Sequence, residues 1–190
     1  MKDGPPDGKA NLPVVDPVAP GSGHDRREQT GDPVVAGVLL AAGLGTRFRA
    51  GNKLLADHEG EPIVVRAARS LLDAGLPTVA VLGHEAGRVA GALRTLDTDG
   101  RLAFVGNPDY RAGQSTSVRA GIRAVCGAAA AAFSLGDMPA VSPDAVRSLV
   151  RAYRNGAGDA LAAAHEGRRG NPVLFDARIP ARTEVDWPAR

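Results

Sequence analysis

The sequence predicts an α/β domain with a mainly parallel sheet and helices on both faces. Three observations predict it. The chain has 190 residues, enough for about one domain with an appendage. With 44% hydrophobic and 23% charged residues, its composition is that of a globular protein. Short apolar runs of strand length also alternate along the chain with segments of helical spacing, which is typical of parallel sheets with crossover helices.

The N-terminal segment differs in composition from the rest. Residues 1–33 hold six prolines and five glycines with almost no apolar periodicity, so we expect a disordered N-terminal tail. The folded domain is predicted over residues 34–176, followed by an atypical short C-terminal tail at 177–190.

The predicted strands are continuous apolar runs, as expected of strands buried on both faces. They lie at residues 34–40, 78–82, 102–105, 128–135 and 159–164. Helical spacing fills the intervals at 63–74, 89–96, 116–126 and, after Ser142 and Pro143, at 146–153. A serine N-cap followed by proline is a good helix start. Residues 167–170 are predicted to form the turn of a hairpin that ends in a strand at 172–175.

Composition also excludes several functions. A net charge of +2 and only seven aromatic residues argue against a nucleic-acid partner. No apolar run approaches the roughly 18 residues of a membrane span, so we expect a cytoplasmic protein without a membrane partner. The lone Cys126 has no intrachain disulfide partner, and we expect it to be a small buried helix residue.

A glycine-rich loop follows the first predicted strand. Residues 40–47 read Leu-Ala-Ala-Gly-Leu-Gly-Thr-Arg, and Lys53 after them is the only lysine beyond the first nine residues. Ligands of parallel sheets bind at this end of the strands. Glycines let successive N–H groups approach an anion, and Arg47 and Lys53 add positive charge. The loop therefore predicts a triphosphate site.

Two common glycine motifs do not fit this loop. The dinucleotide fingerprint G-x-G-x-x-G begins at Gly43 and Gly45, but Phe48 stands at its third glycine. The G-x-x-x-x-G-K-[ST] pattern fails because Asn52 separates Gly51 from Lys53.

Two further loops leave the carboxyl ends of predicted strands. The first, Gly-Asp-Met-Pro at 136–139, places a carboxylate beside the predicted triphosphate. Such a carboxylate is unfavourable there unless a cation lies between, so Asp137 is predicted to bind Mg²⁺; the alternative is a turn-forming or capping aspartate. The second, residues 107–117, ends in Ser115, Thr116 and Ser117 before a helix, more hydroxyls than one N-cap needs.

With these motifs the chain resembles the MobA-like NTP transferase family, most nearly its molybdenum cofactor cytidylyltransferase branch. The resemblance covers about residues 34–176. It rests on residues 40–47 with Lys53, Gly-Gln-Ser-Thr-Ser-Val at 113–118, Gly-Asp-Met-Pro at 136–139 and Arg-Gly-Asn-Pro-Val at 169–173. The first and third motifs recur in many nucleotidyltransferases, whereas all four in this order are more specific.

The resemblance implies a Rossmann-like nucleotidyltransferase fold and transfer of CMP from CTP to the phosphate of molybdopterin cofactor, with Mg²⁺ on Asp137. It also implies possible contact with a molybdoenzyme or its maturation factor. Arg169–Asn171 would face the second substrate, and the methyl group of Ala42 would narrow the base site towards a pyrimidine. Catalytic roles fall to Arg47, Lys53 and Asp137. The residues implied to hold the nucleotide are Leu40, Ala41, Ala42, Gly43, Gly45, Arg47, Lys53, Asn107 and Ser115.

The C-terminal end departs from the family pattern. Members of the family typically continue further and carry a second metal-binding aspartate in an Asp-x-Asp-Thr-Pro stretch. Only 15 residues follow Phe175 here, and Asp176 and Asp186 stand in no such context. We therefore expect the stretch from Asp176 onwards to be poorly packed and to leave a sheet edge open.

Three alternatives remain open at this stage. The first is nucleotidyl transfer to another small phosphate such as a sugar phosphate. The second is a degenerate relative that binds nucleotide with little turnover. An NAD-dependent oxidoreductase is disfavoured by Phe48 and by Ile63, which stands where a ribose-binding acid is expected. His84, after the second predicted strand, is either a solvated loop residue or a contact to base or ribose.

Overall fold

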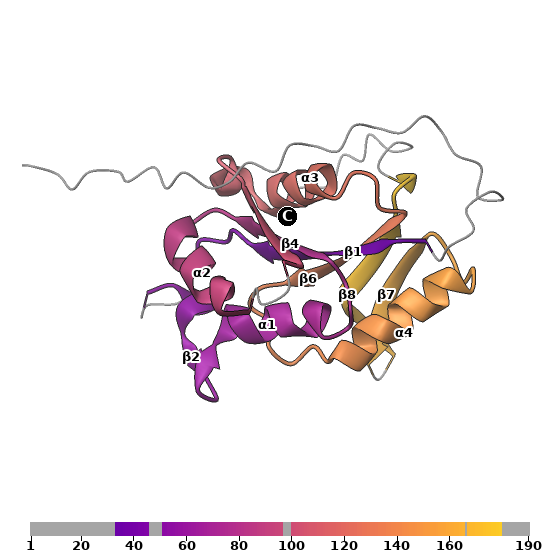
Figure 1. Ribbon diagram of the computed structural model, residues 1–190, viewed down its shortest axis with the longest axis horizontal. Helices are drawn as coiled ribbons and strands as arrows, with labels where there is room; N and C mark the ends of the chain where they lie inside the picture. Colours follow the sequence, from indigo (N-terminus) through magenta and orange to yellow (C-terminus); the bar gives the residue numbers. More distant parts are fainter. Residues whose placement is uncertain (1–32, 46–50, 97–99, 166, 180–190) are drawn as a thin grey trace, which may run out of the picture.

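A single six-stranded sheet organises the molecule. The computed structural model describes residues 33–45, 51–96, 100–165 and 167–179, so most of the predicted tails, Arg47 and Asp186 lie outside the described residues. The strand order is β5-β4-β1-β6-β8-β7 (Figure 1). The strands are β1 (Val35–Ala41), β4 (Thr78–Leu82), β5 (Leu102–Gly106), β6 (Ala130–Leu135), β7 (Ala160–His165) and β8 (Arg168–Asp176).

The direction of the strands divides the sheet into two parts. β5, β4, β1 and β6 are mutually parallel, whereas β8 runs antiparallel to both β6 and β7. The mainly parallel sheet and the hairpin are therefore confirmed. The second strand of the hairpin starts earlier than predicted, because Arg168 and Arg169 already pair with His165 and Ala164.

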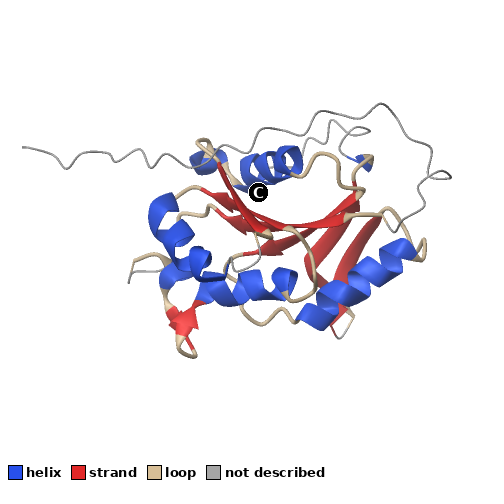
Figure 2. Ribbon diagram, in the orientation of Figure 1, coloured by secondary structure: helices blue, strands red, loops and turns tan. Residues whose placement is uncertain are grey.

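Helices cover both faces of the sheet, as predicted (Figures 1 and 2). One face carries α1 (Ile63–Leu72), α2 (Ala86–Leu93) and α4 (Pro143–Arg154), and the other carries α3 (Gln114–Ala124). The Oγ of Ser142 accepts a hydrogen bond from the N–H of Ala145 at 3.2 Å, which caps α4. Three short 3₁₀ helices, η1 (Lys53–Leu55), η2 (Arg94–Leu96) and η3 (Tyr110–Ala112), and a small ribbon of β2 (Asp57–His58) with β3 (Glu61–Pro62) complete the described elements. No described helix is long and apolar enough to cross a membrane.

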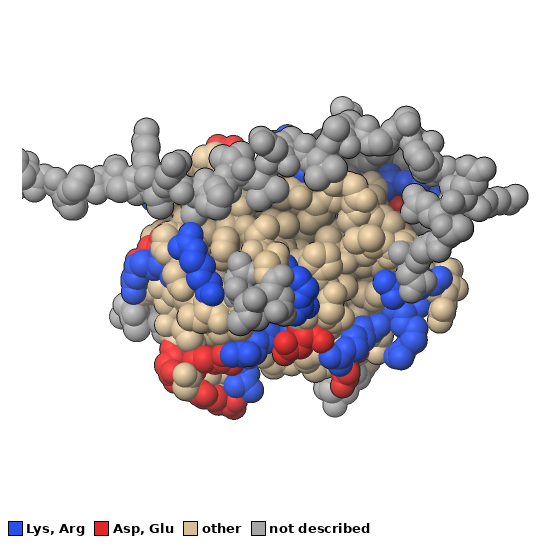
Figure 3. Space-filling model, in the orientation of Figure 1, with Lys and Arg blue, Asp and Glu red and all other residues tan. Residues whose placement is uncertain are grey.

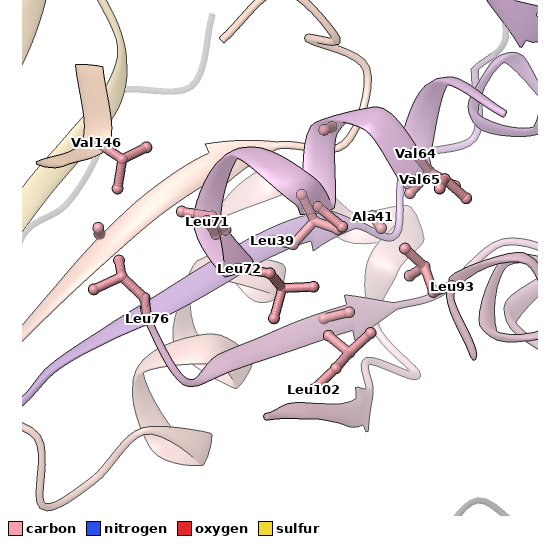
Figure 4. Close-up of a cluster of buried hydrophobic side chains, with 14 of the residues drawn as sticks. Leu39, Ala41, Val64, Val65, Leu71, Leu72, Leu76, Leu93, Leu102 and Val146 are labelled. Carbon is pink, nitrogen blue, oxygen red and sulfur yellow. The ribbon is translucent and has the colours of Figure 1, made fainter. Parts of the chain in front are cut away.

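Two apolar layers hold the sheet between its helices. Leu39, Leu71 and Leu93 belong to the larger layer, under α1 and α2 (Figure 4). Val38 and Phe133 belong to the smaller layer, under α3. Neighbouring residues of β1 thus point into opposite layers, which explains why the strand is apolar at every position.

Charged side chains lie on the outside in pairs of opposite sign. Figure 3 shows basic and acidic side chains next to one another along β2, α1 and α4. The ion pairs there join Arg66 to Glu59, Arg69 to Glu61 and Arg147 to Asp144. Exposed pairs of this kind contribute only about 0–1 kcal/mol each.

The position of Cys126 contradicts the sequence-based expectation. α3 ends at Ala124, and Cys126 is exposed in the turn that follows. Helical spacing extends to Val125, but Gly127 with a φ of 102° turns the chain towards β6. The side chain therefore leaves the buried face.

The expectation of a poorly packed end is wrong for the residues around Asp176. Asp176 is only 2% exposed and ends β8 beside Ala130, the first residue of β6. Its carboxylate accepts hydrogen bonds from the hydroxyl of Tyr153 at 2.8 Å and from the Nε of Arg178 at 2.8 Å. Burial alone would raise the pKa of Asp176, but the hydrogen bonds from Arg178 and Tyr153 outweigh it and lower the pKa to about 2.

We expect Asp176→Asn to lower the free energy of unfolding by about 2 kcal/mol at neutral pH. The carboxylate has a lowered pKa in the folded protein, so its stabilising effect is complete above the ordinary value of 3.8 and is lost as the pH falls through about 2. Urea unfolding of both proteins at several pH values measures this difference. Asp144→Asn, at a carboxylate that is 88% exposed, is the control and should cost less than about 1 kcal/mol. An equal loss of stability in both variants would contradict the stabilising role of the Asp176 carboxylate.

Candidate functional site

The carboxyl ends of the parallel strands meet at one edge of the sheet, and backbone hydrogen bonds join the loops that leave them. The N–H of Gly136 donates to the carbonyl of Leu40 at 2.9 Å, and the N–H of His84 donates to the carbonyl of Ala42 at 3.2 Å. The N–H of Asn107 donates to the carbonyl of Leu82 at 2.7 Å. Four loops from β1, β4, β5 and β6 therefore form one connected surface at the edge where α/β sheets bind ligands.

Lys53 and Asp137 meet at this edge. The Nζ of Lys53 lies 3.0 Å from the Oδ2 of Asp137, although the two residues are 84 positions apart. The side chains are 42% and 44% exposed, respectively. The structure thus brings together the one lysine of the glycine-rich loop and the acidic residue of the Gly-Asp-Met-Pro loop, with both accessible to a ligand.

The local conformation explains how Lys53 reaches this position. The Oδ1 of Asn52 accepts a hydrogen bond from the N–H of Leu54 at 3.0 Å and so caps η1, whose first residue is Lys53. Gly45 has a φ of 58°, and a Cβ there would lie 3.7 Å from the backbone nitrogen of Lys53. The glycine turn and the lysine therefore lie against each other, as a shared phosphate site requires.

The donor set favours a cation held jointly by protein and ligand. No group of three or more side chains suited to hold a metal occurs among the residues described. Mg²⁺ is usually bound by one or two carboxylates together with substrate phosphates and water. Asp137, whose carboxylate makes no hydrogen bond to a described residue other than Lys53, fits such a site. Asp176 does not take part, because it lies at the opposite end of β6.

Asn107 holds the loop between β5 and α3. It is 5% exposed, and its Nδ2 donates to the hydroxyls of Thr116 at 2.8 Å and Ser117 at 2.9 Å. Its Oδ1 accepts from the N–H of Asp109 at 3.0 Å. Only Ser115 of the three consecutive hydroxyl residues is exposed. These contacts give Asn107 a positioning role, which nothing in the sequence pattern indicated.

The hairpin of β7 and β8 reaches the same edge. Val173 pairs with Phe133, and β8 runs antiparallel to β6, so Arg169 lies on the side where β6 continues to Asp137. Arg168 and Arg169 are exposed and form no ion pair with another described residue. The first residues of β8 therefore lie at the end of the sheet from which the Asp137 loop leaves.

The loops after β4 and β5 bring two rings to the edge. The centroids of the His84 and Tyr110 rings lie 6.3 Å apart, and the guanidinium of Arg111 lies 5.4 Å from the centre of the Tyr110 ring. His84 was a candidate from its position after a predicted strand, whereas the only signal for Tyr110 in the sequence is an aromatic residue inside a loop. Glu85 lies beside them, with its Oε2 4.0 Å from the Nε2 of His84, and its hydrogen bond with Arg88 lowers its pKa.

Comparison with known proteins shows which sequences resemble this chain. The model of the MobA-like NTP transferase domain matches residues 37–186. Nicotine blue oxidoreductase from Paenarthrobacter nicotinovorans is 34% identical over 153 residues, which are 77% of this chain and 73% of that protein. A bifunctional IPC transferase and DIPP synthase from Rubrobacter xylanophilus is 39% identical over 98 residues; the match spans 50% of this chain and only 22% of that protein.

Solved structures share the fold. A nucleotidyl transferase from Methanothermobacter has a TM-score of 0.64 and 26% identity, with 80% of this chain and 75% of that chain covered. The Mycobacterium tuberculosis protein Rv0371c, solved as a complex with manganese, has a TM-score of 0.59 and 22% identity, with 78% and 74% covered. At 22% identity, the similarity to Rv0371c shows a shared fold alone.

We expect Asn107→Ala to lower the free energy of unfolding by about 1–3 kcal/mol, because it leaves the buried hydroxyl of Ser117 without its donor. Chemical denaturation measures the loss. The matched substitution Ser115→Ala, on an exposed side chain eight positions later, should change stability by less than about 0.5 kcal/mol. If both variants were as stable as the wild type, Asn107 would not hold the loop.

Proposed function

The chain belongs to the MobA-like NTP transferase family, a family of nucleotidyltransferases, and from this premise we propose that it transfers CMP from CTP to the phosphate of molybdopterin cofactor. The observation that carries the proposal is the meeting of Lys53 and Asp137 at the ligand-binding edge of the sheet. One residue is a cation suited to phosphate, and the other is a carboxylate suited to a divalent metal ion.

The reaction requires positioning and charge neutralisation more than covalent help from the protein. A terminal phosphate oxygen of the acceptor attacks the α-phosphorus of CTP in line, the new P–O bond forms, and the bond to pyrophosphate breaks. The backbone N–H groups of residues 42–45, with Lys53 and Arg47, hold the β- and γ-phosphates. Mg²⁺, when bound, would neutralise negative charge on the phosphate oxygens, and Asp137 is the residue that would hold it.

The ion pair between Lys53 and Asp137 suits an exchange of partners. Both side chains are partly exposed, so the pair itself contributes only about 0–1 kcal/mol. A triphosphate attracts Lys53 and thereby frees the carboxylate of Asp137 for the metal ion. Each residue keeps an opposite charge beside it before and after the nucleotide binds, which avoids leaving a charge without a partner at the site.

The second substrate would lie on the other side of Asp137. Residues 169–171 of the hairpin would face this substrate, and the positive charge of Arg169 suits an acceptor that carries phosphate. The same charge would suit a sugar phosphate, which remains the alternative acceptor. The choice of CTP rests on Ala42, because guanylyl enzymes of the family usually have glycine there.

A second candidate function is suggested by the relative named nicotine blue oxidoreductase, which is 34% identical. On this reading the same edge would bind a nicotinamide nucleotide and support hydride transfer. Calorimetry with CTP, GTP, ATP and NAD in the presence of Mg²⁺ separates the two functions. Binding of CTP with pyrophosphate release supports the proposal, preference for GTP would contradict the cytidylyl assignment, and binding of NAD alone would favour the oxidoreductase.

A third outcome would identify a degenerate relative. Asp137 belongs to no group of three or more potential metal ligands among the described residues, and Mg²⁺ gives up its water reluctantly. If CTP binds but no pyrophosphate is released with molybdopterin cofactor or with sugar phosphates, the chain is a nucleotide-binding protein with little turnover.

We expect Lys53→Ala to weaken CTP binding by roughly 10- to 100-fold, because it removes a charge-assisted contact to phosphate. Isothermal calorimetry measures the affinity, and thermal unfolding checks the fold. Arg123→Ala, which removes an exposed cation near the far end of α3, is the matched control and should leave the affinity unchanged. A variant that melts early while binding CTP normally would show that Lys53 is structural.

We expect Asp137→Asn to abolish metal-dependent release of pyrophosphate while the protein stays folded, because the amide lacks the negative charge that holds the cation. A coupled assay for pyrophosphate measures turnover. Asp144→Asn, at the start of α4 and in contact with Arg147, should retain full activity. Undiminished turnover in Asp137→Asn would remove this residue from the mechanism.

A further inference from the structure

Tyr110 and His84 lie where the nucleoside end of a bound nucleotide would extend. The phosphate-binding pair, Lys53 and Asp137, belongs to the loops that follow β1 and β6. β4 and β5 lie on the other side of β1 in the sheet order. A nucleotide with its phosphates between β1 and β6 therefore has the ends of β4 and β5 available to its ribose and base. Tyr110 follows β5, and His84 follows β4.

The Tyr110 ring is partly exposed, and its buried side contacts apolar residues. It packs against the apolar layer under α3, which includes Ala42 and Val81. Its hydroxyl makes no hydrogen bond to a described residue. The side chain of His84, beside it, is 34% exposed. The guanidinium of Arg111, 5.4 Å from the centre of the ring, belongs to an exposed side chain that a ligand can displace. A flat, partly exposed ring is a surface on which a nucleobase can stack.

Gly83 allows the close approach that fixes this ring. A Cβ at position 83 would lie 2.7 Å from the Cβ of Tyr110, 2.7 Å from the carbonyl oxygen of Ala42 and 2.8 Å from the Cβ of Ala42. None of these atoms is the end of a flexible side chain, so any larger residue at 83 would push the loops apart. The loops after β1, β4 and β5 thus lock together at Ala42, Gly83 and Tyr110.

This packing also bears on the predicted role of Ala42. Ala42 is only 3% exposed, and its methyl group lies against position 83 and the layer under α3. Ala42 would therefore act on a nucleobase mainly indirectly, because its methyl group helps to position Gly83 and Tyr110. The rings of Tyr110 and His84 are the exposed parts of this assembly.

We propose that Tyr110, flanked by His84, is a base-contacting residue whose ring stacks on the nucleobase of the bound nucleoside triphosphate. The proposal rests on the proposed function, since it takes the site to be one for a nucleoside triphosphate. Stacking on an aromatic ring tolerates every base because each base has a π face. Tyr110 therefore adds affinity for the nucleoside without selecting among the bases.

Two ligands distinguish stacking from a structural role. CTP carries a base, whereas inorganic tripolyphosphate carries only the phosphate chain. We expect Tyr110→Leu to weaken CTP binding about 10-fold and to leave the affinity for tripolyphosphate unchanged. Tyr110→Phe keeps the ring and should bind CTP within about 3-fold of the wild type. Calorimetry measures the dissociation constant of each protein for each ligand, and thermal unfolding checks each variant.

Equal weakening of CTP and tripolyphosphate binding by Tyr110→Leu would overturn the proposal, because it would show a purely structural role for the tyrosine. Unchanged CTP binding would overturn it as well. If the leucine variant does not fold, nuclear Overhauser effects between the cytosine protons of CTP and the Tyr110 ring in the wild type supply the test; their presence supports stacking, and their absence excludes it. A wild type that binds tripolyphosphate but not CTP would contradict the proposed function itself.

Discussion

The ion pair between Lys53 and Asp137 is the contact on which the functional reading of this structure depends. It joins a loop after the first strand of the domain to a loop that follows a strand almost a hundred residues later. A parallel sheet allows this meeting, because β1 and β6 are neighbours and end at the same edge. Since both side chains remain partly exposed, the pair is weak enough to open for a ligand and close enough to keep both charges in place.

The two ends of the sheet serve different purposes. At the carboxyl end, polar and charged side chains are exposed around Lys53, Asp137 and the arginines of the hairpin. At the amino end, the buried carboxylate of Asp176 is saturated with hydrogen bonds from Tyr153 and Arg178 and ties β8 to α4. The shared fold does not determine the reaction, as a relative named an oxidoreductase shows.

The sequence predicted the parts that follow from local pattern. Continuous apolar runs located the strands, and Ser142 with Pro143 located the start of α4, because burial on two faces and capping leave a signal in neighbouring residues. Lys53 and Asp137 were singled out by residue type and by their place after strands.

What the sequence missed depends on contacts between distant residues. Asn107 engages hydroxyls nine and ten positions away, Tyr110 fits only because Gly83 lacks a side chain, and Asp176 is buried by partners on α4 and in the turn after β8. Cys126 was misplaced because helical spacing continues past the last helical residue. These contacts join residues from different segments, so no periodicity or motif within one segment predicts them.

The effect of Mg²⁺ on CTP affinity tests directly whether Asp137 holds a cation beside the nucleotide. Calorimetric titration of CTP into the wild-type protein, with saturating Mg²⁺ and with a chelator, measures how strongly metal and nucleotide binding are coupled. If the triphosphate draws Lys53 away and Asp137 then takes the cation, Mg²⁺ should tighten CTP binding about 10-fold. The same CTP affinity with and without Mg²⁺ would contradict the account, because Asp137 would then not hold a metal ion beside the nucleotide.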